Sequence, residues 1–257
     1  MENPIILQNK PLVEAIFEIR WKLKEVAPNV EIDPYIDLLV GRLYDRLRDQ
    51  YPEYEALPTS RMPQEICRYI IQHRYRKAQG GWPLIQLGPG ILTVNETEGY
   101  LWDLFKNQIF QAISTLNELY PQTNGNFAIK RLQLRYIDAI EFDFNKSNIL
   151  TFLNDKLKVN FEFQQKLFNE TIQPIPTSID FNIGFPTTNP NGELKCRFIR
   201  GKKNQRDALI WETIIESTEQ AVPSNLMAVK NWVVEAHNIT HSWFLKMIEG
   251  DLRRRFE

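Results

Sequence analysis

The chain has 257 residues, of which 43% are hydrophobic and 25% are charged. These proportions are those of a globular protein, and they exclude a disordered chain, a collagen or a coiled coil as a description of the whole. Its 31 basic residues balance 32 acidic residues for a net charge of −1, so no global basic field exists to hold nucleic acid. We expect one globular unit spanning 1–257.

The location expected from the sequence is the cytoplasm, with no membrane partner. No apolar stretch approaches the length of a membrane span, and the start Met1-Glu2-Asn3-Pro4 lacks a signal-peptide core. The two cysteines, Cys67 and Cys196, both lie in apolar, strand-like runs. We interpret them as buried free thiols of a reducing compartment, with one structural disulfide as the alternative.

Hydrophobic periodicity predicts the elements of the first half. Strict alternation marks a half-buried strand over 12–22, and Asp33-Pro34 is typical of an N-cap followed by proline at the start of a helix. The remaining expected elements, in chain order, are that helix to about 50, a loop over 51–63, strands over 66–76, 84–88 and 91–94, and a helix over 101–119.

The second half repeats this organisation. Its expected elements are a strand over 132–144, helices over 148–157 and 162–168, strands over 179–185, 194–199 and 208–215, and a closing helix over 223–255. Because most strands are consecutive, hairpins dominate and the class is α+β. We expect two similar halves, about 1–125 and 126–257. They would form a curved, largely antiparallel sheet with helices on one face and a long C-terminal helix. By analogy alone, this layout resembles a duplicated TATA-binding-protein-like or ferredoxin-like arrangement.

Several segments together carry a resemblance to a family. They are PLVEAIFEIRW at 11–21, LIQLG at 84–88, Asn95, Tyr100, Trp102 and Phe105, LRYID at 134–138, and Ala236-His237 with Phe244. In order and spacing they resemble an uncharacterised, sporadically distributed prokaryotic family of about this length, with no established activity. The match runs from about 11 to 252. The resemblance implies a prokaryotic cytoplasmic protein, and its patchy distribution suggests a link to defence, but it supplies no mechanism.

One candidate catalytic site is a D-x(n)-E-x-K pattern formed by Asp180, Glu193 and Lys195. In metal-dependent nucleases of this type, two carboxylates hold Mg²⁺ and a lysine orients the attacking water. The competing interpretation is the ordinary polar face of a hairpin, because three common charged residues match so loose a pattern often.

The closing helix contains a candidate metal pair. His237 and His241 are four residues apart and project from the same side of the helix, as metal ligands do. A zinc site normally needs three protein ligands, and the pattern indicates no third. We therefore expect His237 to be a buried histidine with a polar partner, and its helix to be buried at Trp232, Val233, Ala236, Phe244 and Met247.

The carboxylates Asp138, Glu141 and Asp143 cluster near the end of one predicted strand. Asp138 falls on the opposite strand face from the other two, so the three cannot converge on a metal without a bulge. We interpret this cluster as a solvated strand end.

A set of arginines is predicted to lie on the sheet face away from the helices: Arg20, Arg68, Arg74, Arg76, Arg135 and Arg197. The planar, five-donor guanidinium suits carboxylates, phosphates and aromatic rings, so this face is a candidate binding surface. The alternative is ion pairing within the chain, with acidic residues on neighbouring strands.

The sequence lacks the phosphate loop, the dinucleotide fingerprint, the nucleophile elbow and the zinc-protease helix motif. We therefore predict a nonenzymatic binding or interaction protein that needs no cofactor and joins a protein partner in a larger prokaryotic assembly. A Mg²⁺-dependent nuclease is the first alternative. The second is a noncatalytic nucleic-acid binder that uses the arginine-rich face, with Lys202 and Lys203 beside it.

Overall fold

A computed structural model describes residues 7–97, 99–121 and 127–257, and one antiparallel sheet of nine strands organises the fold. The strand order is β4-β5-β6-β7-β1-β8-β11-β10-β9. The strands are β1 (Leu12–Trp21), β4 (Glu53–Ala56), β5 (His73–Arg76), β6 (Leu84–Gly88), β7 (Ile91–Glu96), β8 (Ile129–Glu141), β9 (Asp180–Thr188), β10 (Asn191–Lys203) and β11 (Arg206–Thr218).

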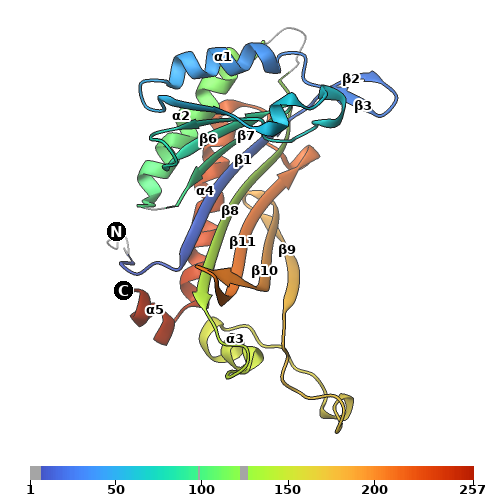
Figure 1. The fold of residues 1–257 in the computed structure, drawn as a ribbon, viewed down its shortest axis with the longest axis vertical. Helices are drawn as coiled ribbons and strands as arrows, with labels where there is room; N and C mark the ends of the chain where they lie inside the picture. Colours follow the sequence, from blue (N-terminus) through green and yellow to red (C-terminus); the bar gives the residue numbers. More distant parts are fainter. Residues whose placement is uncertain (1–6, 98, 122–126) are drawn as a thin grey trace.

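Helices cover one face of this curved sheet (Figure 1). They are α1 (Ile36–Leu47), α2 (Trp102–Leu119) and the long α4 (Leu226–Met247), while α3 (Ile149–Leu157) and α5 (Asp251–Phe256) lie at one end. The opposite face, which carries Glu18, Arg135, Lys195 and Glu212 on its strands, is called the open face below. The α+β prediction, with helices on one side and a long C-terminal helix, is confirmed.

The two halves of the chain meet at the central pair β1 and β8, which run antiparallel. In each half, the last strand returns to pair with the first, so β7 pairs with β1 and β11 pairs with β8. A helix then follows that last strand and covers the same face, α2 in the first half and α4 in the second. The expected boundary between the halves, at 125–126, lies outside the described residues, as does the start of the chain, Met1–Pro4.

The core lies between the sheet and the helices. Along β1, Ala15, Phe17, Ile19 and Trp21 are buried on the helix-covered face, which is the alternation that the sequence showed. The apolar stripe of α1 packs onto the same core. Burial of each large side chain contributes roughly 1.5–3 kcal/mol, so this periodic pattern fixes which face of each element turns inward.

The strand predicted over 66–76 is wrong in its first part. A short 3₁₀ helix (Gln64–Ile66) comes first, Tyr69 has a φ of 60°, and β5 begins only at His73. A tyrosine in the left-handed region cannot continue a pleated strand. Its loop instead crosses the β6–β7 turn, where Tyr69 N donates to the Pro89 carbonyl at 3.0 Å. A Cβ added at Gly88 would lie 1.9 Å from the Ile70 carbonyl oxygen, so this crossing requires glycine.

Three further elements differ from the predicted ones, two of them because of turn residues. The closing helix ends at Met247, and Gly250, with a φ of 104°, separates it from α5. The polar stretch 201–206 mostly continues β10 and β11, because Asn204 and Gln205 both have positive φ and make a two-residue hairpin turn. Over 162–168, only Gln165–Leu167 is helical, as a 3₁₀ turn.

Two pieces of sheet lie where no strand was predicted. The strand β4 occupies part of the proline-containing segment 51–63 and pairs with β5 at the edge of the sheet. A separate hairpin joins β2 (Lys24–Ala27) to β3 (Val30–Ile32). These strands have no buried residues and are only three or four residues long, so they are too short for hydrophobic alternation to identify them.

The two cysteines are buried free thiols, as predicted. Within the part of the chain that the structure describes, no helix combines the length and apolarity needed to cross a bilayer.

Candidate functional site

The three residues of the proposed nuclease pattern do not converge. On β9, Asp180 lies opposite Ile199 of β10, whereas Glu193 lies opposite Pro186, so the two carboxylates are about 20 Å apart along the strands. The Asp180 carboxylate instead accepts two hydrogen bonds from Arg197, at 2.9 and 2.8 Å, which lower its pKa. Lys195 Nζ lies 3.4 Å from both Glu193 and Glu216. Asp180 is thus paired with Arg197, away from Glu193 and Lys195, which contact each other.

The histidine pair of α4 is part of a packed cluster. The His237 ring stacks on Trp102 at 3.6 Å between centroids, and its Nδ1 hydrogen bonds to the Tyr136 hydroxyl at 3.0 Å. The predicted burial of His237 with a polar partner is therefore confirmed. The His241 ring lies 5.3 Å away, but among the described residues no group of three potential metal ligands exists. The pair alone does not make a metal centre.

All six predicted arginines have a carboxylate partner within the chain. The pairs are Arg20–Glu18, Arg68–Glu31, Arg74–Glu55, Arg76–Glu55, Arg135–Glu212 and Arg197–Asp180. Arg68 is not on the sheet, because the strand predicted there is a loop, and it contacts the β2–β3 hairpin instead. The open face is thus a layer of compensated charges rather than a basic patch.

The ion pairs of Arg68 and Arg74, which are exposed or partly exposed, contribute little to stability. We expect an Arg68→Ala, Arg74→Ala double variant to lose less than about 1 kcal/mol of unfolding free energy per ion pair, because solvent screens such pairs. Urea denaturation of the double variant measures this, with Arg42→Ala as a control, for which the described residues supply no ion pair. A much larger loss would show that these arginines hold the first half together.

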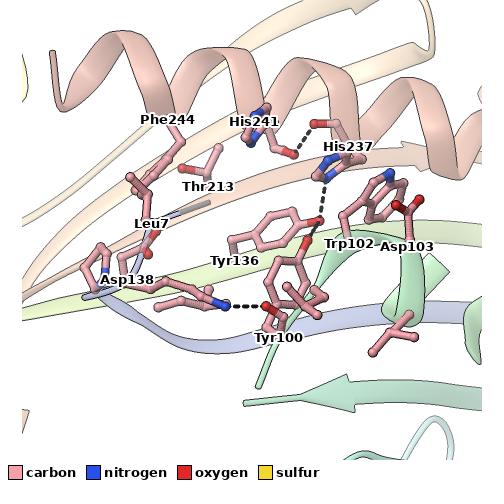
Figure 2. Close-up of a pocket in the computed structure, with 16 residues that line it drawn as sticks. Leu7, Tyr100, Trp102, Asp103, Tyr136, Asp138, Thr213, His237, His241 and Phe244 are labelled. Carbon is pink, nitrogen blue, oxygen red and sulfur yellow. Dashed lines mark hydrogen bonds between the residues drawn. The ribbon is translucent and has the colours of Figure 1, made fainter. Parts of the chain in front are cut away.

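A cavity lies between the sheet and the helices α2 and α4 (Figure 2). Its volume is about 530 Å³. Its floor comes from β1, β8 and β11, its roof from α4, and its two ends from the residues before β1 and at the start of α2. Residues that line it include Leu12, Tyr100, Trp102, Tyr136, Asp138 and Phe244. This volume is within the usual range for small-molecule sites.

A hydrogen-bonded chain crosses one end of the cavity. The Tyr100 and Tyr136 hydroxyls lie 3.1 Å apart, and Tyr136 continues to His237 Nδ1, as Figure 2 shows. Burial raises the pKa of both tyrosines and lowers the pKa of His237 to about 3, with His241 adding to the second effect. At neutral pH these groups are therefore all uncharged. The chain fixes the position of α4 relative to β8 and the start of α2.

Two polar side chains in the cavity wall have no partner. Asp138 is only 3% exposed, and no described residue donates a hydrogen bond or forms an ion pair with its carboxylate. Burial raises its pKa to about 8, while the charge of Lys203 acts weakly in the opposite direction. Thr213 is 2% exposed, and its Oγ1 lacks a partner among the described residues. Such groups are rare in protein interiors and call for an explanation.

The prediction of a solvated strand end is therefore wrong for Asp138. Glu141 and Asp143 are exposed, and Glu141 pairs with Arg206, but Asp138 faces the core beside Leu12 and Trp211. The sequence did contain the signal, since Asp138 falls in the same strand phase as the buried Leu134 and Ile140.

The helix face of α4 differs from its prediction at one residue. Trp232, Val233, Ala236 and Met247 are buried as expected. Phe244 is only partly buried, because it lines the cavity instead of packing fully into the core. Phe244, Tyr100, Trp102 and Asp138 all belong to the segments that carry the family resemblance, and the fold gathers them around this one cavity.

No protein-family model matches the chain, and no curated protein matches it.

Proposed function

We propose that this chain is a nonenzymatic binding protein that holds a small, largely apolar molecule in the cavity between the sheet, α2 and α4. One observation supports this most strongly: two nearly buried polar side chains, Asp138 and Thr213, face a mainly apolar cavity, and no described residue hydrogen bonds to either of them there. A mostly apolar pocket with a few convergent polar groups is the usual form of a ligand site.

The low pKa and the hydrogen bond of His237 argue against a role for this histidine as a general base. A general base works best with a pKa near the working pH, whereas the pKa of His237 is about 3. Its Nδ1 is also engaged by Tyr136. Burial raises the pKa of Asp138 to about 8, and no described nucleophile contacts its carboxyl group.

The other expected functions stay predictions. A role as one component of a prokaryotic, defence-linked assembly with a protein partner is compatible with a ligand-holding unit. The nucleic-acid alternative is weakened because the arginines of the open face are already neutralised by neighbouring carboxylates. The nuclease alternative with Mg²⁺ is weakened by the separation of Asp180 from Glu193.

A cavity-filling variant tests the proposed function. We expect the wild-type protein to bind one molecule of octanol, and we expect Thr213→Phe to reduce that affinity at least tenfold, because the ring would occupy the floor of the cavity. Isothermal titration calorimetry measures both. The matched control is Ile214→Phe, which adds the same ring on the same strand but toward the open face, where Ile214 lies beside Arg135.

Two outcomes would overturn the proposal. One is that octanol and its charged analogues, octylamine and octanoate, all fail to bind the wild-type protein. The other is that Thr213→Phe and Ile214→Phe bind octanol equally well, since the molecule would then sit outside the cavity.

A further inference from the structure

The cavity contains one carboxyl group, that of Asp138, with which no described residue forms an ion pair. Of the charged residues that line it, Asp103 pairs with Lys106 at 2.8 Å, and the Lys10 ammonium donates to the Tyr100 carbonyl oxygen. Asp138 has neither kind of contact with any described residue. Lys203, the nearby cation from β10, uses its Nζ on the Ala139 carbonyl at 2.9 Å. A cation brought by a ligand would therefore stabilise the ionised carboxylate of Asp138.

The rest of the wall is also suited to a cation. The rings of Tyr100 and Tyr136 meet edge to face at 5.8 Å, and Trp102 and Phe244 line the same space. The faces of aromatic rings carry partial negative charge and attract ammonium groups. One ammonium already uses this wall, since Lys10 Nζ lies 5.7 Å from the centre of the Tyr100 ring.

We propose that the molecule held in this cavity carries a protonated amine, which lies against the Asp138 carboxylate while its apolar remainder packs among Trp102, Leu104 and Phe244. This inference rests on the proposed function and names the chemical class of the ligand. An anionic ligand is disfavoured, because it would approach an acidic group whose ionised form repels it. A neutral ligand would leave Asp138 protonated, so it would gain no charge interaction with this buried carboxyl group.

Binding of an amine must release a proton. Burial keeps Asp138 mainly protonated at neutral pH in the empty cavity, whereas an ammonium ligand needs the ionised carboxylate. The proton lost by Asp138 passes to solvent, and the amine keeps its own. The other charged or titratable groups around the cavity are Lys10, Tyr100, Asp103, Tyr136, Lys203, His237 and His241. Both histidines have a lowered pKa, and that of His237 is about 3, so His237 stays neutral between about pH 6 and pH 8.

The sign of the pH dependence follows from this release. Amine affinity should rise by about tenfold per pH unit from about pH 6 until Asp138 ionises near pH 8. The affinity of a neutral molecule of the same shape should not rise over this range.

The experiment compares three probes of one chain length: octylamine, octanol and octanoate. At about pH 8, we expect calorimetry to show octylamine binding at least tenfold more tightly than octanol, and octanoate binding most weakly. Asp138→Asn should weaken the affinity for octylamine by about 30-fold or more and change the affinity for octanol little. The matched control is Asp103→Asn at the cavity mouth, where the carboxylate is exposed and paired, and it should change octylamine affinity little.

Proton release provides a second measurement that needs no variant. Titration of the wild-type protein with octylamine near pH 7, in buffers of different ionisation enthalpy, should show nearly one proton released per amine bound. If octanol binds as tightly as octylamine, or if no proton is released, the amine inference fails while the proposed function stands. If octanoate binds most tightly, the ligand is an anion and Lys10 is its contact. Failure of all three probes removes the proposed function itself.

Discussion

Asp138→Asn is expected to raise the free energy of unfolding by roughly 3–6 kcal/mol near pH 9 and to change it little near pH 4. Burial raises the pKa of the Asp138 carboxyl to about 8, far above its value in an unfolded chain. Between these two pKa values the folded protein binds one more proton than the unfolded chain does. The wild-type protein therefore loses about 1.4 kcal/mol of stability per pH unit over this range, relative to a variant without the group.

The measurement is urea denaturation of both proteins at several pH values. Asparagine has nearly the shape of a protonated aspartic acid, so the two proteins should be almost equally stable at the acid end. Asp143→Asn is the control, because Asp143 lies on the adjoining segment but is exposed, and its pKa is lowered by hydrogen bonds rather than raised. A stability difference between wild type and Asp138→Asn that does not grow with pH would mean that solvent or an ion already compensates Asp138.

Asp33→Ala is expected to lower the free energy of unfolding by about 3–5 kcal/mol. Asp33 is fully buried and accepts hydrogen bonds from Trp21 Nε1 at 2.9 Å, the Gly90 amide at 3.1 Å, the Tyr35 amide at 3.1 Å and the Tyr120 hydroxyl at 3.3 Å. Through these bonds it joins β1, the β6–β7 turn, the start of α1 and the end of α2. Alanine would leave the Gly90 amide buried without its acceptor and would remove the carboxylate partner of Trp21 Nε1.

Two further variants show how much of this loss of unfolding free energy comes from the hydrogen bonds of Asp33. Asp33→Asn keeps one acceptor oxygen, so it should lower the free energy of unfolding clearly less than Asp33→Ala does. Asp37→Ala removes an exposed carboxylate from the first turn of α1 and should cost below about 1 kcal/mol. If urea denaturation showed the same small loss of unfolding free energy for Asp33→Ala and Asp37→Ala, the four hydrogen bonds around Asp33 would not hold the first half together.

The outcome at Asp33 shows what a local pattern can identify. Asp33-Pro34 predicted the start of a helix, and a helix does start there, but Tyr35 is its N-cap residue. Sequence neighbours define a helix start, because the unpaired amides of its first turn are close along the chain. The partners of the Asp33 carboxylate at Trp21, Gly90 and Tyr120 are far away in sequence, so no local pattern reveals them.

The sequence by itself determined the fold class, the positions of β1 and α2, and which residues of β8 face the core. It could do so because alternation and helical spacing record which side of each element is buried. Only the tertiary structure decided the chemistry. The register of β9 against β10 separated Asp180 from Glu193, and pairing across strands neutralised Arg135 and Arg197. Packing of α4 over β8 enclosed Asp138 in a cavity where no described residue forms a hydrogen bond or an ion pair with it. Charge depends on distances between residues that are remote in sequence, and these distances exist only once the strands and helices have assembled.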